Sequence, residues 1–156
     1  MSSEAIAREW ISKMINTLEI YDFNAHMNLI SKNAKIFDLT GIKVINYDDW
    51  YKLCEEEFLQ KSITSAQYTQ VSSSVFSHKQ IMFNALQIIH SRSGAIYEQA
   101  VEHVIVKEDE GEWRLVQQRA LTKKQAKKKG LKVNIVMPSL RQSEVFRLHE
   151  QPARFS

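Results

Sequence analysis

The sequence contains few of the residues that make cross-links and tight turns. Its 156 residues include one cysteine, two prolines and four glycines. A single cysteine forms neither an internal disulfide nor a site built from several thiolates. Cys54 lies at a helical spacing in the segment WYKLCEEEF. We therefore expect its thiol to be a small buried side chain rather than a reactive group.

Sequence motifs of several large enzyme classes are also absent. The chain has no His-x-His, no His-Glu-x-x-His, no glycine-rich phosphate loop and no Gly-x-Ser-x-Gly. These patterns are typical of metal centres, nucleotide binding and serine-hydrolase chemistry. We expect neither a metal nor a cofactor, so any catalysis would depend on the protein's own side chains.

Long apolar runs are missing as well. No stretch approaches the roughly 20 apolar residues that a membrane-spanning helix needs. The N-terminal segment MSSEAIAREW contains charged residues and lacks the apolar core of a signal peptide. We expect no membrane span and a cytoplasmic location.

Charge is distributed unevenly along the chain. Residues 1–119 hold 12 Lys and Arg against 16 Asp and Glu, whereas residues 120–156 hold 9 against 2. Both prolines also lie in the second part. The pattern predicts a domain over residues 1–122 and a basic extension over 123–156 that packs on the domain or on a second subunit. The basic run lacks interleaved aromatics for base stacking, so nucleic acid is not the favoured partner.

Hydrophobic spacing divides the domain into helices followed by strands. Apolar residues recur every three or four positions over residues 4–21 and 48–60, which predicts amphipathic helices. A shorter helix is expected over 21–31, and a hairpin over 34–47. Four long β-rich runs follow over 65–121. The predicted fold class is α+β, with three helices packed on a curved antiparallel or mixed sheet of about six strands.

Two segments carry a resemblance to a known superfamily. IYDFNAHMNLISKNAKIFDL joins helix to strand ahead of the third helix, and EGEWRLVQQRAL runs from an acidic-glycine turn into the last strand. This order, over roughly residues 4–122, resembles the NTF2-like (cystatin-like) superfamily, especially its SnoaL-like members. The resemblance implies a cone-shaped fold with a deep pocket between sheet and helices, and a homodimer formed through the sheet. Members include ketosteroid isomerases, scytalone dehydratases and polyketide cyclases, but also non-catalytic binding modules.

Asp38 is the first candidate for a catalytic group. It interrupts the apolar run KIFDL and alternates with Phe37, so its side chain shares a strand face with Ile36. The isomerases that this chain resembles place a catalytic aspartate on an early strand. Asp38 is therefore either a general acid or base facing a pocket, or an ordinary polar residue near the sheet edge.

Two histidines and a tyrosine are further catalytic candidates. Tyr97, Gln99, Val101 and His103 share one face of a predicted strand, which we expect to point inward because Glu residues occupy the other face. Such a histidine is either a proton-transfer group or a hydrogen-bonded core residue. His90 shares a face with apolar residues of the preceding strand. Tyr21 lies in a Tyr-Asp pair that the scytalone dehydratases also have. We expect His26, His78 and His149 to be solvated.

Two hypotheses of function follow. The first is a SnoaL-like pocket protein that acts as a cofactor-independent isomerase, dehydratase or cyclase on a small hydrophobic or aromatic ligand, with Asp38, His103, His90 and Tyr21 as proton-transfer or oxyanion groups. The second is a non-catalytic dimerisation or ligand-binding module, or an auxiliary subunit of the dioxygenase type. The expected ligand-binding residues are Trp10, Met14, Phe37, Trp50, Tyr68, Phe76 and Tyr97.

Overall fold

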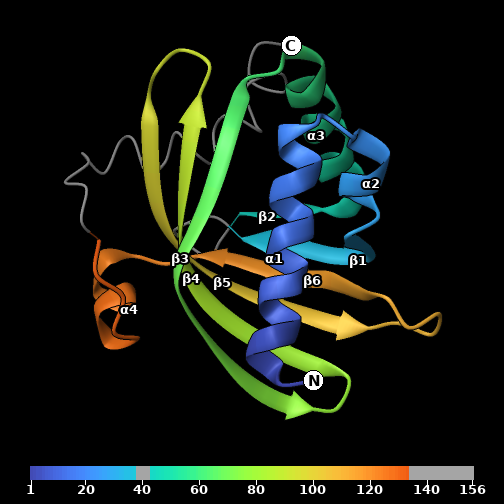
Figure 1. Ribbon diagram of the computed structural model, residues 1–156, viewed down its shortest axis with the longest axis vertical. Coiled ribbons are helices and arrows are strands. Elements are labelled where there is room, and N and C mark those ends of the chain that lie inside the picture. Colours follow the sequence, from blue (N-terminus) through green and yellow to red (C-terminus); the bar gives the residue numbers. More distant parts are fainter. Residues whose placement is uncertain (38–42, 134–156) are drawn as a thin grey trace.

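The computed structural model describes residues 1–37 and 43–133, and shows helices on a strongly bent sheet (Figure 1). Helices α1 to α3 lie on one side of this sheet and α4 lies on the other. The elements in chain order are α1 (Ser3–Glu19), α2 (Phe23–Met27), β1 (Ile30–Phe37), β2 (Val44–Asn46), α3 (Tyr47–Gln60), β3 (Ile63–Ser77), β4 (Gln80–Ser91), β5 (Ile96–Lys107), β6 (Trp113–Ala120) and α4 (Lys123–Lys128).

The six strands form one mixed sheet in the order β2-β1-β6-β5-β4-β3. β1 runs parallel to β6, and the other neighbouring pairs are antiparallel. Gly94 and Gly111 have φ values of 92° and 88° in the reversals before β5 and β6, a conformation that glycine adopts without steric cost. The predicted α+β fold, with three N-terminal helices and about six strands, is confirmed.

Strand β3 gives the sheet much of its curvature. Its pairing with β4 shifts register between Thr69 and Ser72 and again between Val75 and Ser77. Gln70, within the first shift, has a positive φ of 55°. Irregularities of this kind bend and twist a strand, and Figure 1 shows β3 and β4 curving around α1. The bend creates a concave face that helices can cover.

Helix α1 fills one end of this concave face with an aromatic cluster. Its Trp10 ring centroid lies 5.9 Å from Phe83 on β4 and 5.8 Å from His103 on β5. The Trp10 indole Nε1 donates a hydrogen bond of 3.2 Å to the carbonyl oxygen of Leu29. Buried indole N–H groups need such a partner, so this bond ties α1 to the start of β1.

The second helix is shorter than predicted. α2 ends at Met27 and β1 already begins at Ile30, inside the segment expected to be helical. The Leu29 carbonyl oxygen accepts hydrogen bonds from the Trp10 indole and from the backbone N–H of Leu115. These tertiary hydrogen bonds favour a strand over a helix from Ile30 onward. The spacing of apolar residues along the chain does not predict this.

The opposite face of the sheet is partly covered by the segment that follows β6. Ala126 on α4 and Leu131 are buried against Leu86 on β4 and Ala100 on β5. The lysines of this segment are exposed, and Lys129 Nζ lies 3.2 Å from Glu102 Oε2 on β5. Apolar packing and this ion pair therefore join the segment to the sheet, while most of its basic charge faces solvent. No helix within residues 1–37 and 43–133 is long and apolar enough to span a membrane.

Candidate functional site

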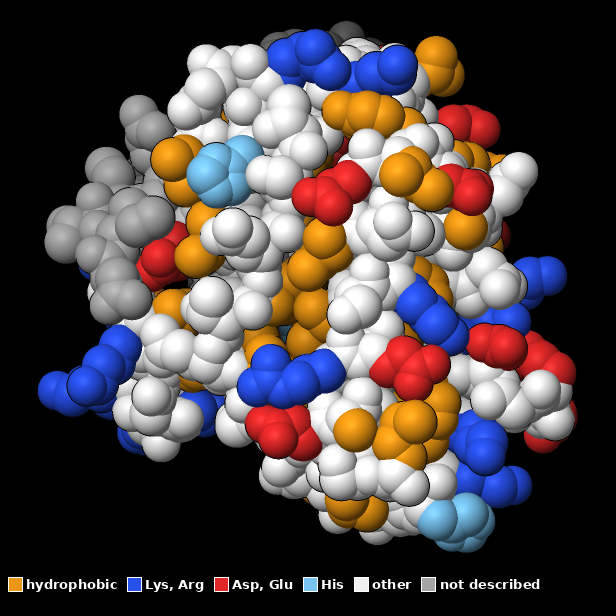
Figure 2. Space-filling view, in the orientation of Figure 1, with side chains coloured by type: hydrophobic (Ala, Val, Ile, Leu, Met, Phe, Trp, Pro, Cys, Tyr) orange, Lys and Arg blue, Asp and Glu red, His pale blue; other side chains and the backbone are white. Residues whose placement is uncertain are grey.

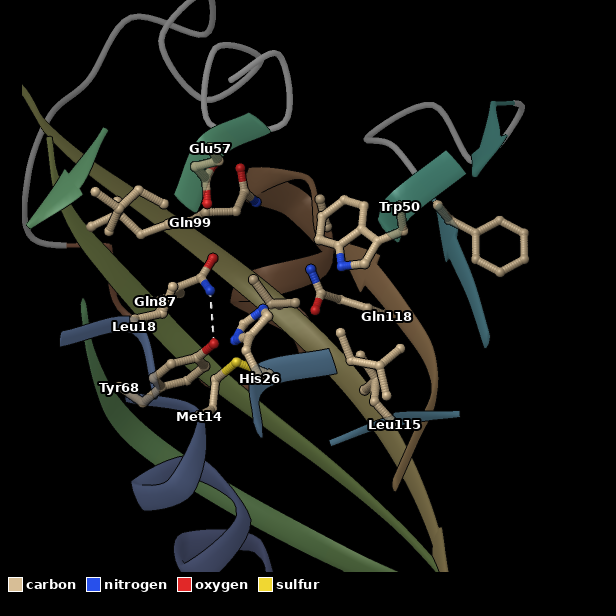
Figure 3. A pocket seen from close by; sticks show the side chains of 16 residues that line it. Met14, Leu18, His26, Trp50, Glu57, Tyr68, Gln87, Gln99, Leu115 and Gln118 are labelled. Atoms are coloured by element: carbon tan, nitrogen blue, oxygen red, sulfur yellow. Dashed lines mark hydrogen bonds between the residues drawn. The ribbon is translucent and has the colours of Figure 1, made fainter. Parts of the chain in front are cut away.

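A cavity of about 70 Å³ lies between the concave face of the sheet and helices α1 to α3. Such a volume holds a few water molecules. Figure 3 shows the lining side chains, and Figure 2, in the orientation of Figure 1, shows hydrophobic side chains gathered in a hollow near the middle of the molecule. The apolar lining residues are Met14, Leu18, Ile30, Phe37, Trp50, Ile63, Ile89, Val101, Leu115 and Ala120, and the polar ones are His26, Glu57, Tyr68, Gln87, Gln99 and Gln118.

His26 enters the cavity lining from α2, with 5% of its surface exposed. The Thr17 hydroxyl donates to the Met14 carbonyl oxygen at 2.8 Å and lies 3.2 Å from His26 Nδ1. Because Thr17 gives its only hydroxyl proton to a carbonyl, Nδ1 must be the donor in the second bond. His26 Nε2 then carries the lone pair. Burial lowers the pKa of His26 to about 4, so the ring is neutral at pH 7.

Glu57 enters the lining from α3. The spacing of Trp50, Leu53, Cys54 and Glu57 places all four on the buried side of this helix. The Glu57 side chain is buried, and the loss of hydration raises its pKa to about 8. Most Glu57 carboxyls therefore carry a proton at pH 7. Glu57 thus has the reverse of its usual protonation state in water, whereas His26 stays neutral to a much lower pH than a free imidazole, so the cavity holds a proton donor and a proton acceptor.

Three polar side chains form a row across neighbouring strands. Tyr68 on β3 lies opposite Gln87 on β4, and Gln87 lies opposite Gln99 on β5. Facing residues of antiparallel strands have Cβ atoms about 5 Å apart. Gln87 Nε2 donates to the Tyr68 oxygen at 2.7 Å. Burial raises the pKa of Tyr68 to about 12, so its hydroxyl keeps a proton that it can donate.

The amide of Gln99 has a fixed orientation. Its Nε2 donates to the carbonyl oxygens of Ala100 at 2.8 Å and Leu121 at 3.0 Å. An inverted amide would place Oε1 against those two oxygens, so the assignment of nitrogen and oxygen is unambiguous. Gln99 Oε1 is buried and has no hydrogen-bond partner among the described residues. Gln99 is thus fixed in the wall of the cavity by its amide nitrogen.

Four predicted ligand-binding residues line the cavity, namely Met14, Phe37, Trp50 and Tyr68. Trp10, near the middle of α1, belongs instead to the aromatic cluster with Phe83 and His103. Tyr97 is buried against Ile63 and Ile89 and is not part of the lining.

Phe76 was expected in the pocket, but it is 58% exposed. It lies near the β3–β4 turn, within the register shift between Val75 and Ser77. The shift breaks the simple alternation of strand faces on which the expectation depended.

Asp38 lies outside the described residues, so its catalytic role stays a prediction. His103 is fully buried, as its strand face predicted. Its ring stacks on Phe83 at 4.5 Å and lies 5.8 Å from the Tyr68 ring, but it does not reach the cavity surface. Burial lowers the pKa of His103 to about 3, so this neutral ring belongs to the core beside Tyr68.

Two other catalytic candidates also lie away from the cavity. His90 follows Ile89, which lines the cavity, and successive strand residues face opposite sides. His90 shares the strand face of Leu86, and α4 packs against Leu86 on that face. Tyr21 adopts a positive φ of 57° in the turn after α1, and Lys61 Nζ lies 5.1 Å from its ring centroid. Neither residue contributes to the lining.

His26 and Glu57 were not among the expected site residues, although their spacing carried a signal. His26 was expected to be solvated, but it lies three residues after Phe23 and so shares its helix face. Glu57 lies three residues after Cys54 and seven after Trp50, on the apolar stripe of α3. A polar residue on a buried stripe is the feature that identifies both. Within the described part of the chain, no cluster of three or more His, Cys, Asp or Glu side chains could hold a metal ion.

No protein-family model and no curated protein matches this sequence. Solved structures do match it. An NTF2-like protein of unknown function from Shewanella oneidensis MR-1 has a TM-score of 0.65 at 11% identity, over 76% of this chain and 98% of that chain. An NTF2-like protein from Cytophaga hutchinsonii has a TM-score of 0.64 at 9% identity, over 78% and 99%. A Novosphingobium aromaticivorans protein, provisionally assigned as a scytalone dehydratase, has a TM-score of 0.60 at 11% identity, over 74% and 80%. The fold is therefore NTF2-like.

Proposed function

We propose that this NTF2-like protein binds a small, mostly apolar ring compound in the cavity and catalyses cofactor-independent proton transfer on it. The reaction class would be that of a SnoaL-like isomerase, dehydratase or cyclase. The observation that supports this is the presence of a neutral imidazole, His26, and a mostly protonated carboxyl group, Glu57, in one mostly apolar cavity. The assignment of a structural neighbour as a scytalone dehydratase is consistent with this class.

His26 and Glu57 divide the proton transfer between them. His26 Nε2 removes a proton from a ligand carbon next to a carbonyl group, and the protonated Glu57 donates a proton to another atom of the same ligand. The Tyr68 hydroxyl stabilises the negative charge that develops on the carbonyl oxygen. Return of the proton from His26 to the Glu57 carboxylate restores the starting state, so an isomerisation closes with no net change in protons.

Cyclohexanone in D2O tests this proposal without knowledge of the natural substrate. Exchange of its α-protons for deuterium requires only the proton-removal step, and 1H NMR follows the loss of their signal. We expect the protein to accelerate the exchange and His26→Gln to slow it by about 100-fold or more. His78→Gln, a matched change of an exposed histidine in the β3–β4 turn, should leave the rate unchanged.

Asp38→Asn belongs in the same assay. Loss of exchange in this variant, with His26→Gln still active, would make Asp38 the general base and would contradict the role given to His26.

A non-catalytic binding module is the second candidate. The aromatic cluster of Trp10, Phe83 and His103 fills part of the concave face, and the cavity described above is small. A module of this kind would bind cyclohexanone, as detected by chemical-shift changes of the lining residues, while exchange proceeds at the rate in buffer. That combination of results would decide against catalysis.

A further inference from the structure

We infer that the outer edge of β3, along Ser72–Phe76, is a docking site for the chain's own extension. The occupant is the segment 134–137, which lies outside the described residues and would add one strand to the sheet. The inference concerns the edge of the sheet and is independent of the cavity.

Strand β3 is an edge strand without the usual protection. It lies at one end of the sheet, and in the described part of the chain it pairs only with β4. Natural edge strands are commonly very short or carry charge or proline, because their free N–H and C=O groups pair readily with another strand. β2, at the other edge, has three residues. β3 has 15, with no charged residue and no proline.

The exposed part of this edge lies beyond the first register shift. Ser72–Val75 pair in regular register with β4, so their outer side is straight enough to accept a further strand. Val75 and Phe76 are 59% and 58% exposed. Apolar side chains exposed beside an unpaired backbone are typical of a surface that another segment covers.

The extension reaches β3 within the described residues. Lys129 is held at β5 by Glu102, whereas Lys132 contacts β3, and β4 lies between these two strands. The backbone N–H of Lys132 donates to Gln70 Oε1, and its carbonyl oxygen accepts from Gln70 Nε2, both at 2.8 Å. The chain therefore crosses the outer face of the sheet toward its free edge, and the described part ends one residue later.

The side chain of Gln70 holds the extension as a neighbouring strand would. Its amide binds both backbone groups of one residue, Lys132, which is how paired residues of antiparallel strands exchange hydrogen bonds. Gln70 also has a positive φ of 55° within the register shift. This conformation is unfavourable for a residue with a Cβ atom, and the two bonds to Lys132 compensate for it.

The sequence after Gly130 has the period of a strand. Leu131 is buried, Lys132 is exposed, and Val133 packs against the same apolar cluster as Leu131. Ile135 and Met137 continue this alternation, and Pro138 follows. Alternation predicts a half-buried strand, and proline ends it because it has no N–H. From Gln70 toward Phe76 the added strand would run parallel to β3.

Amide hydrogen exchange on the full chain, followed by NMR, tests the inference. A covered edge protects those amides of Ser72–Phe76 that point away from β4. Ile135→Pro and Val136→Pro each remove one N–H, and because successive N–H groups point in opposite directions, one of the two must remove a bond to β3. We expect at least one variant to speed the exchange of these amides tenfold or more. Ser143→Pro, beyond Pro138, should leave it unchanged.

Three results would overturn the inference. The first is exchange of the outward amides in the wild type as fast as in an unpaired loop. The second is protection that persists in both proline variants. The third is protection that grows with protein concentration, which would assign the edge to a second copy of the chain. Should a proline variant fail to fold, backbone NOEs between residues 134–137 and Ser72–Phe76 in the wild type decide alone.

Discussion

Thr17 determines which nitrogen of His26 carries the lone pair. Its hydroxyl is oriented by the Met14 carbonyl oxygen of its own helix, so it presents an acceptor to Nδ1 of His26. Neither residue determines the tautomer of His26 alone, because a free imidazole exchanges readily between its two neutral tautomers. The base that we propose is therefore a property of the Thr17–His26 pair.

Thr17→Val tests this pairing, because valine keeps the side-chain shape and removes the acceptor. We expect the unpartnered Nδ1–H to cost about 1–3 kcal/mol of unfolding free energy, and the tautomer to shift toward protonation at Nε2. The 15N chemical shifts of the two ring nitrogens report the tautomer. Thr17→Ser keeps the hydroxyl and should keep the wild-type shifts. Unchanged shifts in Thr17→Val would show that another group sets the tautomer.

At the scale of elements, α3 holds Glu57 in place through the way the helix ends. Lys61 follows the last turn in the left-handed region, with φ 52° and ψ 43°, and its backbone N–H caps the carbonyl oxygens of Glu57 and Phe58. This conformation strains any residue with a Cβ atom and suits glycine. The helix therefore ends at Gln60, with Glu57 in its last turn and two turns after Trp50.

Lys61→Gly should relieve the strain at the end of α3. We expect a gain of about 0.5–1 kcal/mol in unfolding free energy, measured by chemical denaturation. Lys61→Ala is the control, because it also removes the ammonium group from the Tyr21 ring but keeps a Cβ atom. Its stability should equal or fall below that of the wild type. Equal stability of the glycine and alanine variants would show that the left-handed conformation carries no strain.

At the scale of the whole molecule, three buried groups shape the dependence of stability on pH. His26 and His103 have pKa values of about 4 and about 3, below the ordinary value of 6.5. The unfolded chain takes up their protons first as pH falls below 6.5, so stability is lost toward acid. Glu57 has a raised pKa of about 8. The unfolded chain releases this proton first as pH rises above about 4.5, so stability is lost toward base.

The sum of these effects predicts a maximum of stability near pH 6.5. Below that pH the two histidines change the unfolding free energy with pH more than Glu57 does. Between pH 6.5 and 8 Glu57 makes the largest contribution of the three. Glu57→Gln removes the decline on the alkaline side and should exceed the wild type by about 4 kcal/mol at pH 8, with little difference at pH 4.5. Urea denaturation from pH 4.5 to 8.5 measures both curves. Wild-type stability that still rises between pH 6.5 and 8 would contradict the burial of an ionisable Glu57.

Much of the fold could be predicted because the signals are local. The apolar spacing of α1 and α3 and the long runs of β3 to β6 repeat within each segment, and glycine marks two of the reversals. The same alternation placed His103 and Tyr97 on the inner face. It could not distinguish a side chain that lines a cavity from one that fills the core, because that depends on how far the neighbouring helices reach.

By itself, the sequence determined the elements, their order and the α+β class, since one buried face per element imposes its period on the residues. Only the tertiary structure decided the candidate site. It brings His26, Glu57 and Gln99 together from α2, α3 and β5, and encloses them in apolar walls. The burial that shifts the pKa values of His26 and Glu57 comes from residues distant in the chain. Hydration of a side chain is a property of the packed molecule, and no local pattern contains it.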